Sequence, residues 1–297
     1  MGIHEQDQNG RHQRLLDPCH FDSPLDGNLG FNLQNGVIVL PSRLLRKQRR
    51  IAAVKRCARL NGVSMPTHGK LIVLEGIDGS GKHTQLEMLA RAFSSRRIPF
   101  IQVSFPRYDG FFGKLVARFL NGEFGPLESV DAHFSALLYA GDRLEARPGM
   151  ESALASGQAV LADRYIGSNL AHQGARVPRD KRYEFLKWLM QLEYEIYGLP
   201  VEDLVVYLQV PAAEAHRLVG EKGARSYTRM QRDLQEANLA HLEGASEVYD
   251  ELARQPNWVK IDCFNAATHA LHAPEEIHRK ILAAVEERVF PALQANH

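Results

Sequence analysis

The chain has 297 residues, of which 36 are Lys or Arg and 35 are Asp or Glu, and 44% of its residues are hydrophobic. A chain of this length can bury a full core, as one large domain or as a domain with an appendage. The balanced charge gives no general attraction to nucleic acid or to a membrane surface, and no apolar run is long enough to span a bilayer. Cys19, Cys57 and Cys263 are widely separated, without partners at metal-ligand spacing, and the N-terminus lacks a secretory pattern. We therefore expect reduced thiols in a cytoplasmic protein.

Residues 1–66 differ in composition from the rest of the chain. They hold ten basic and five acidic residues, which leaves 26 of the 36 basic and 30 of the 35 acidic residues to 67–297. Residues 1–36 are polar and aperiodic, so we assign them no structure. A basic helix-like segment over 43–60 could touch RNA or an anionic membrane, but an accessory extension is favoured because Met65 directly precedes the first core strand. We divide the chain into this N-terminal extension, 1–66, and a main domain, 67–297.

From Lys70 onward, apolar runs of strand length alternate with amphipathic segments of helix length, which predicts an α/β fold with a mainly parallel sheet. In such a sheet, ligands bind beyond the carboxyl ends of the strands. The predicted strands are Leu71–Glu75, Phe100–Ser104, Ala159–Ala162, Leu204–Gln209 and Val259–Asp262. The predicted helices are Lys82–Phe93, Phe112–Leu120, Ser129–Ala146, Arg179–Tyr197, Ala212–Leu218, Met230–Leu252 and Pro274–Val289.

The first predicted strand leads into a glycine-rich loop that ends in lysine and opens a helix. Glycines allow backbone angles and close approaches that let successive N–H groups converge on a phosphate, and the helix adds its positive N-terminal end. Lys82 is placed to reach the outer phosphates of a nucleotide. The usual pattern has Ser or Thr after the lysine, whereas this chain has His83 and then Thr84. The predicted ATP-binding residues are Gly76, Ile77, Asp78, Gly79, Ser80, Gly81, Lys82, His83 and Thr84.

Polar side chains follow the second and third predicted strands. Arg107 and Arg164 suit phosphate, because a guanidinium group pairs with two oxygens and stays charged. Asp163 ends the third strand, where P-loop enzymes place a carboxylate that helps to hold Mg²⁺. Tyr139 and Arg143 lie four residues apart on one helix face, so a ring that stacks on a base stands beside a donor for the edge of that base.

These separated motifs, in this order, resemble the thymidylate kinase family of P-loop nucleoside monophosphate kinases over about residues 68–292. The resemblance implies a three-layer α/β/α P-loop NTPase fold with a five-stranded parallel sheet and a helical lid. It also implies ATP-dependent phosphorylation of dTMP to dTDP, Mg²⁺ as the cofactor of ATP, and a homodimer. From the balanced charge we expect no nucleic-acid or membrane partner. The motifs are Glu75-Gly-Ile-Asp-Gly-Ser-Gly-Lys82, Phe105-Pro-Arg-Tyr108, Leu138-Tyr-Ala-Gly-Asp-Arg143 and Asp163-Arg-Tyr165 with Ser168-Asn169.

The resemblance also implies roles for single residues. Tyr139 would stack on thymine, while Arg143 and Asn169 would pair with its edge. Asp78 would face the sugar 3′-hydroxyl and the metal-phosphate region, and His172 stands where some members place a tyrosine near the ribose 2′ carbon. Arg107, Tyr108 and Arg164 would hold the acceptor phosphate. The implied dTMP-binding residues are Asp78, Arg107, Tyr108, Tyr139, Arg143, Arg164, Ser168, Asn169 and His172.

The stretch from Gly220 to Arg232 resembles the mobile lid of the family. Since the P-loop has no arginine, we expect the lid to supply catalytic cations and, on closing, to exclude water. Lys222 and Arg232 are candidates, and Arg225 and Arg229 are favoured. The predicted catalytic residues are Lys82, Arg107, Arg164, Arg225 and Arg229.

His83 stands where a hydroxyl group would normally reach the metal ion. Imidazole is a poor ligand for Mg²⁺, so we expect ATP phosphates, waters and Asp163 or Asp78 to hold the ion. Two other readings stay open. One is a kinase for another deoxynucleotide or a deoxynucleoside, and the other is a nucleotide-binding regulator without turnover, suggested by His83 and the basic extension.

Overall fold

The structure is a computed structural model that describes residues 32–34, 37–39, 68–220 and 238–291. Its central feature is a five-stranded sheet. Its strands run across the sheet in the order β4-β5-β3-β6-β7, and every neighbouring pair is parallel. The strands are β3 (Leu71–Glu75), β4 (Phe100–Ser104), β5 (Ala159–Asp163), β6 (Leu204–Gln209) and β7 (Trp258–Asp262). The predicted five-stranded parallel sheet is confirmed.

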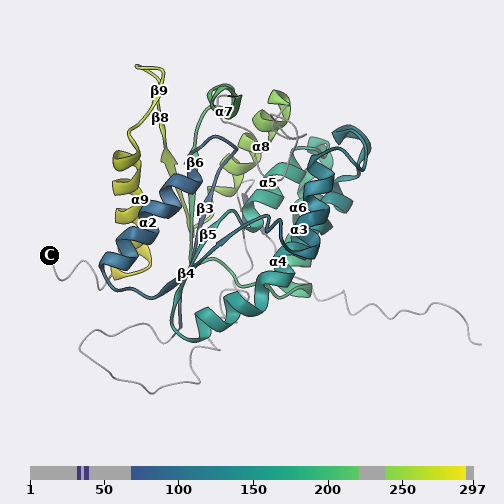
Figure 1. The fold of residues 1–297 in the computed structure, drawn as a ribbon. Coiled ribbons are helices and arrows are strands. Elements are labelled where there is room, and N and C mark those ends of the chain that lie inside the picture. The colour runs from purple at the N-terminus through teal and green to yellow at the C-terminus, as the bar shows by residue number, and fades with distance from the viewer. Residues whose placement is uncertain (1–31, 35–36, 40–67, 221–237, 292–297) are drawn as a thin grey trace, which may run out of the picture. The chain divides into compact units, whose positions relative to one another are not determined.

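Helices cover both faces of this sheet and make a three-layer α/β/α arrangement (Figure 1). On one face α2 (Lys82–Ser95) packs against α9 (Pro274–Arg288). On the other, α5 (Ile166–Gly174) packs against α4 (Ala132–Ala155) and α8 (Leu239–Leu252). Outside them, α3 (Phe111–Leu120) packs against α4 and α6 (Arg179–Met190) packs against α5. Helix α7 (Ala212–Gly220) packs against α8.

The sheet brings three loops to one edge. Leu71 to Leu74 are fully buried in β3, as expected for a strand covered on both faces. In the strand register, Asp163 lies opposite Leu74 on β3 and opposite Ser104 on β4, so the three strands end at the same level. The segments that follow them, which carry the predicted phosphate-binding residues, therefore meet beyond this edge.

One helix next to this edge was not predicted. The sequence prediction assigns polar side chains but no helix to the residues after β5, and these residues form α5, whose nine residues are all buried. An amphipathic helix is recognised by its alternation of polar and apolar faces, and a helix buried all round has none. Gly167 and Gly174 also lower helix propensity, so the sequence contains little signal for this helix.

Several helix boundaries also differ from prediction. Helix α4 begins after Asp131, whose carboxylate accepts from the backbone N–H groups of His133 at 2.8 Å and Phe134 at 3.2 Å, and it continues through Pro148 to Ala155. A short 3-10 turn, Leu127–Ser129, precedes it. The predicted helix over 179–197 is α6 followed by a π-helix, Gln191–Ile196. Prediction from periodicity placed the start of α4 too early because it missed the Asp131 cap.

Two short antiparallel pairs complete the fold. The pair β8 (Phe264–Asn265) and β9 (Ala270–Leu271) was not predicted, and neither was β1 (Asn32–Gln34) with β2 (Val37–Val39), whose first strand lies in the segment assigned no structure. The predicted segment over 43–60 and the lid beyond Gly220, with its candidate cations, lie outside the described residues. Among the described helices, none combines the length and apolar character needed to cross a membrane.

Candidate active site

The loop between β3 and α2 has the backbone geometry of a phosphate-binding loop. Gly76 and Gly79 have φ angles of +146° and +89°, and a Cβ atom there would lie 2.7 Å from the Leu208 carbonyl oxygen and 2.6 Å from that of Ala215. Helix α2 begins directly after Gly81, which provides no side-chain cap, and it has no acidic residue in its first turn. Its first N–H groups are thus left for an anion from outside the chain.

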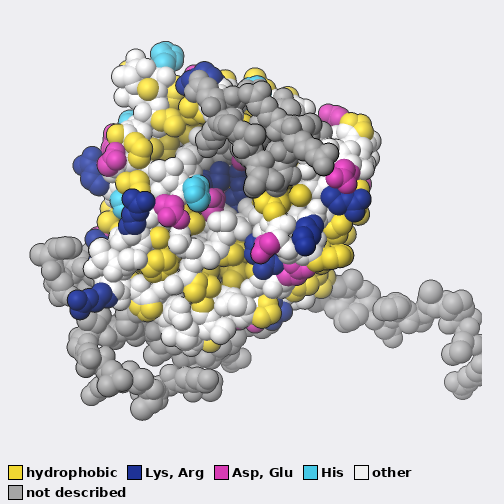
Figure 2. Space-filling view, viewed as in Figure 1, with side chains coloured by type: hydrophobic (Ala, Val, Ile, Leu, Met, Phe, Trp, Pro, Cys, Tyr) yellow, Lys and Arg dark blue, Asp and Glu magenta, His cyan; other side chains and the backbone are white. Residues whose placement is uncertain are grey.

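A cavity of about 280 Å³, here called the P-loop cavity, opens in front of this loop. Six of the nine predicted ATP-binding residues line it, and Gly76, Ile77 and Ser80 do not. Acidic, basic and histidine side chains gather near the middle of the face shown in Figure 2. The lining residues are Asp78, Gly79, Gly81, Lys82, His83, Thr84, Phe105, Asp163 and Arg164.

Lys82 is held in place before any nucleotide arrives. Its Nζ atom donates to the Ile77 carbonyl oxygen at 2.9 Å and to Ser80 Oγ at 3.4 Å, and the residue is 6% exposed. Burial, with a smaller contribution from the charge of Arg164, lowers the pKa of Lys82 to about 8. Lys82 is therefore charged at neutral pH, but only by a narrow margin.

This pKa predicts a proton linkage in nucleotide binding. A phosphate beside Lys82 favours the charged amine, so binding raises its pKa and takes up a proton once the pH exceeds about 8. Above that value the affinity for ATP is expected to fall by about tenfold per pH unit. Calorimetry in two buffers with different ionisation enthalpies measures the uptake, and Lys82→Met should abolish it. Affinity that stays constant well above pH 8 would contradict the linkage.

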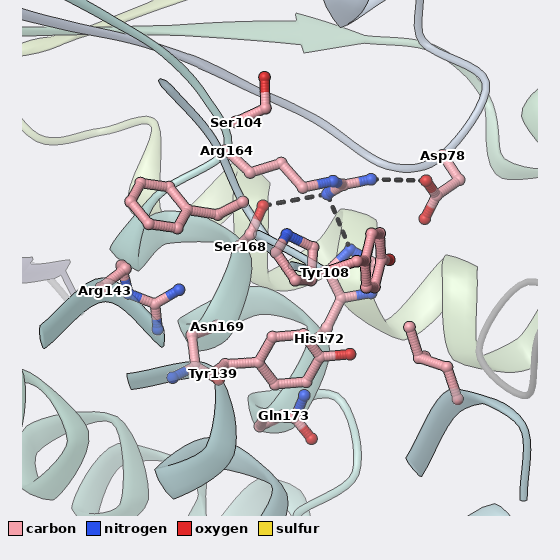
Figure 3. Close-up of a pocket in the computed structure, with 13 residues that line it drawn as sticks. Asp78, Ser104, Tyr108, Tyr139, Arg143, Arg164, Ser168, Asn169, His172 and Gln173 are labelled. Carbon is pink, nitrogen blue, oxygen red and sulfur yellow. Dashed lines mark hydrogen bonds and ion pairs between the residues drawn. The ribbon is translucent and has the colours of Figure 1, made fainter. Parts of the chain in front are cut away.

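A second cavity, of about 210 Å³ and here called the strand-edge cavity, lies beyond the ends of β4 and β5 (Figure 3). Eight of the nine predicted dTMP-binding residues line it together with Ser104, Phe105, Pro106, Leu120 and Gln173. These eight residues are Asp78, Tyr108, Tyr139, Arg143, Arg164, Ser168, Asn169 and His172. Arg107 is the one residue of the predicted set that does not line the cavity.

Arg164 lies where the two cavities meet, and it lines both. Its Nη2 donates to Asp78 Oδ1 at 2.6 Å, and its Nη1 donates to the Gly76 carbonyl oxygen at 3.1 Å and to Ser168 Oγ at 3.0 Å. Its φ angle of +65° is uncommon for a residue with a side chain and is typical of functional turns. Although burial would lower the pKa of Arg164, nearby carboxylates led by Asp78 outweigh it and raise the pKa well above its usual value. Arg164 is thus a fixed cation between the cavities.

Arg107 does not reach either cavity. Its Nε donates to Asp142 Oδ1 at 3.1 Å, and its Nη2 donates to Glu145 Oε2 at 3.2 Å and to the Asp142 carbonyl oxygen at 3.0 Å. Asp142 is 1% exposed and also accepts from the backbone N–H of Arg107 at 2.8 Å. These contacts fix the loop that carries Pro106 and Tyr108 into the strand-edge cavity. In this structure Arg107 orders the cavity wall and lines neither cavity.

Three polar side chains line one side of the strand-edge cavity, and Asn169 lies between Arg143 and Gln173 in Figure 3. Asn169 Nδ2 donates to the Ala136 carbonyl oxygen at 3.0 Å and to a Glu193 oxygen at 2.8 Å, which leaves its Oδ1 buried without a partner. Gln173 Oε1 accepts from Ser135 Oγ and from Arg176, both at 2.8 Å, which leaves its Nε2 buried without a partner. Unpaired buried polar atoms aimed at a cavity indicate a ligand that pairs with them.

His172 and His241 form a buried neutral pair beside Arg164. His172 Nε2 lies 3.4 Å from Arg164 Nη1, and His172 Nδ1 lies 3.3 Å from His241 Nε2. Because the guanidinium can only donate, Nε2 of His172 accepts and its Nδ1–H donates to His241. Burial, followed by the charge of Arg164, lowers the pKa of His172 well below its usual value, and burial lowers that of His241 to about 4.

Asp163 is the described carboxylate best suited to a metal ion. It lines the P-loop cavity, and its Oδ1 atom is buried without a hydrogen-bond partner. Asp78, the other candidate, already pairs with Arg164 at 2.6 Å, and His83 is exposed at the cavity rim. The described residues contain no cluster of three or more His, Cys, Asp or Glu side chains that would form a protein cage. One free carboxylate beside phosphates fits Mg²⁺, which keeps several waters and binds few protein ligands.

Gln173, Glu193 and Glu75 are important residues that the sequence prediction missed. Gln173 stands four residues after Asn169, so recognition of α5 as a helix would have put both on one face. Glu75 is fully buried, and its carboxylate accepts from the backbone N–H groups of Tyr165 and Ser168, both at 2.9 Å, and from Tyr249 at 2.8 Å. A glutamate at the end of an apolar strand was the available signal.

Comparisons with known proteins identify the family of this chain. The family model described as thymidylate kinase matches residues 74–281, more than half of the chain. Thymidylate kinase of Mycobacterium tuberculosis is 34% identical over 194 residues, which cover 62% of this chain and 86% of that protein. The probable thymidylate kinase of Thermococcus gammatolerans is 31% identical over 230 residues, covering 76% of this chain and 100% of that protein. Human thymidylate kinase is 29% identical over 228 residues, covering 76% of this chain and 94% of that protein.

A solved structure supports the same fold. Thymidylate kinase from Candida albicans superposes with a TM-score of 0.58 at 20% identity and covers 74% of this chain and 92% of that chain. The P-loop, the arginine that joins two cavities and the match over residues 74–281 all agree, and the chain belongs to the thymidylate kinase family.

Proposed function

We infer that the two cavities are the two substrate sites of a phosphoryl transfer, with ATP phosphates in the P-loop cavity and dTMP in the strand-edge cavity. As a thymidylate kinase, the protein transfers the γ-phosphoryl group of ATP to dTMP and makes dTDP. Arg164 lines both cavities, so it suits the acceptor phosphate at the point where the γ-phosphate must arrive. Positioning and charge neutralisation supply most of the barrier reduction in this chemistry.

The base assignment rests on the orientation of three polar groups. Arg143 offers Nη1–H, Asn169 offers Oδ1 and Gln173 offers Nε2–H, which is a donor, an acceptor and a donor along one side. Thymine presents the complementary order along O4, N3–H and O2, whereas cytosine presents a donor and then two acceptors. Tyr139 lines the same cavity and supplies an aromatic face for stacking. This match between unpaired groups and a keto pyrimidine is the observation that carries the dTMP assignment.

On the donor side, Lys82 and the N–H groups at the start of α2 suit the ATP phosphates. Mg²⁺, when bound with ATP, neutralises phosphate charge, and Asp163 is the carboxylate best placed to hold it. Asp78 binds Arg164 and so orients the cation that faces both substrates. A dTMP phosphate is already an anionic nucleophile at neutral pH, so the site needs no general base.

Initial rates with dTMP, dUMP, dCMP and ribothymidine monophosphate in a coupled ADP assay test this function. We expect kcat/KM for dTMP to exceed that for dCMP by about 10³-fold, since dCMP leaves the cavity groups unpaired, and that for dUMP by about tenfold for its missing methyl group. Better turnover of dCMP would favour a kinase for another deoxynucleotide. Tight ATP binding without turnover of any monophosphate would favour a regulator.

We also propose that the protein acts as a homodimer in the cytoplasm, as the family resemblance implies. Phe134 and Leu137, three residues apart on α4, are 45% and 37% exposed, which supports a contact surface on that helix. Sedimentation analysis measures the state of association directly. The roles proposed above involve ATP, dTMP and Mg²⁺, and they require no nucleic acid or membrane.

A further inference from the structure

Glu193 is a fully buried carboxylate that does not line the strand-edge cavity but holds two of the residues that do. It lies in the π-helix Gln191–Ile196, which continues the chain from α6. Leu189 and Met190, four and three residues earlier, are also fully buried, so Glu193 occupies the core-facing side of this segment. An apolar side chain would be the ordinary choice there. A charged one requires partners.

The partners of Glu193 are Arg143 and Asn169. Arg143 donates from Nε to Glu193 Oε2 at 2.5 Å and from Nη2 to Oε1 at 2.7 Å. Asn169 Nδ2 donates to the same Oε1 at 2.8 Å. The side chains of Arg143 and Glu193 are 1% and 0% exposed, so the ion pair is closed to water. The Glu193 carboxylate therefore fixes both Arg143 and Asn169 on the side of the strand-edge cavity that is proposed to bind the base.

These contacts decide which atoms face the cavity. With Nε and Nη2 of Arg143 turned to Glu193, Nη1 is the guanidinium nitrogen left for a ligand in the cavity that Arg143 lines. If the amide of Asn169 were flipped, its carbonyl oxygen would face two acceptors, Glu193 Oε1 and the Ala136 carbonyl oxygen. That repulsion keeps Oδ1 toward the cavity. The negative charge of Glu193 thus decides that Arg143 presents a donor and Asn169 an acceptor to the cavity.

We propose that Glu193 is a specificity-determining positioning residue, which selects a 4-keto pyrimidine over a 4-amino pyrimidine without touching the nucleotide. The inference rests on the proposed function, since it assigns the base of dTMP to this side of the cavity. Arg143 Nη1–H then meets O4, and Asn169 Oδ1 meets N3–H. A reversed Asn169 amide would instead present a donor to N3, which suits cytosine.

The substitution Glu193→Gln separates these states. The glutamine amide has one oxygen and one NH₂ group, so it cannot accept from Arg143 at both positions and also from Asn169. When its NH₂ group lies at the Oε1 position, the Asn169 amide reverses and turns Nδ2 to the cavity. We expect the ratio of kcat/KM for dTMP to that for dCMP to fall by about 100-fold. The main change should be a higher KM for dTMP, with the KM for ATP unchanged.

Glu202→Gln is the matched control. Glu202 is 4% exposed and accepts from Tyr194, which lies in the same π-helix, but it lines neither cavity. The same chemical change at this buried site should leave the dTMP to dCMP ratio within about twofold of the wild-type ratio. An equal fall in both variants would mean that loss of core order, and not base reading, changes the ratio, and it would overturn the proposal.

A second variant decides the matter if Glu193→Gln does not fold. Glu193→Asp keeps the charge beside Arg143 but is shorter by one methylene group, so it cannot reach Arg143 and Asn169 together. We expect a fall of about tenfold in the ratio. A wild-type ratio in Glu193→Asp, or in Glu193→Gln where that variant folds, would refute the role of Glu193. Absence of dTMP turnover in the wild-type protein would instead refute the proposed function, so the two failures are distinct.

Discussion

Replacing Arg164 by Lys is expected to lower kcat/KM for dTMP by about 10³-fold, although the positive charge is kept. The guanidinium group binds Asp78, the Gly76 carbonyl oxygen and Ser168 at once, and it lines both cavities. A lysine amine lacks the planar fork that makes these contacts together. The acceptor phosphate would then lie off line with the γ-phosphate, so kcat should fall more than KM rises. Steady-state kinetics on purified protein measure both.

Arg107→Lys is the control for the activity loss expected in Arg164→Lys. Sequence reasoning assigns the acceptor phosphate to both arginines, but the Arg107 side chain is bound to Asp142 and Glu145 outside the cavities. A lysine can keep an ion pair with Asp142, so the loss should be about tenfold or less. If Arg107→Lys lost as much activity as Arg164→Lys, Arg107 would have to turn toward the phosphate during turnover.

Glu75→Gln is expected to lower the free energy of unfolding by about 3 kcal/mol and to reduce kcat strongly. The Glu75 carboxylate accepts from the Tyr165 and Ser168 backbone N–H groups and from the hydroxyl groups of Ser168 and Tyr249. A glutamine NH₂ group would point at donors instead of accepting from them. Since these bonds fix the start of α5 directly after Arg164, loss of stability and loss of activity should occur together. Urea denaturation at neutral pH gives the first, and initial rates give the second.

Glu202→Gln is the control for the expected loss of stability in Glu75→Gln. Glu202 is also a buried glutamate, but it is protonated at neutral pH. Burial raises the pKa of Glu202 from 4.5 to about 8, so the folded protein holds a proton there at neutral pH. Between those two values the wild-type protein loses stability as the pH rises, because the unfolded chain releases that proton and the folded one keeps it. A glutamine needs no such proton, so its stability should equal or exceed that of the wild type. A loss as large as that of Glu75→Gln would show that any change to a buried carboxylate destabilises this fold.

Local signals account for the parts that could be predicted from the sequence. The central strands β3, β5 and β6 are short, apolar runs that the sheet buries on both faces, so composition locates them. Gly76 and Gly79 lie close to the carbonyl oxygens of Leu208 and Ala215, where a side chain would not fit. The sequence indicates these positions directly, because glycine is the residue required there. The family resemblance added the candidate residues of the strand-edge cavity, and eight of the nine line it.

What could not be predicted depends on contacts between distant segments. The direction of the Arg107 side chain is decided by Asp142, which lies 35 residues away. The orientation of the Asn169 amide is decided by Glu193, 24 residues away, in a helix whose π-helical stretch has no simple sequence signature. Burial on all sides hid α5, and with it the position of Gln173 one turn after Asn169. The roles of the lid cations Arg225 and Arg229 stay predictions, since they lie outside the described residues.

The neutral His172 and His241 pair has a consequence for the response of the enzyme to acid. Because burial depresses the pKa of His172 well below its usual value and that of His241 to about 4, neither ring gains charge as the surroundings acidify moderately. The electrostatic field around Arg164 therefore keeps its strength, while a phosphate monoester becomes half protonated near a pH of about 6. A fall in rate at acid pH would then report protonation of the substrate phosphate. His172 and His241 would contribute no change of charge near Arg164 over that pH range.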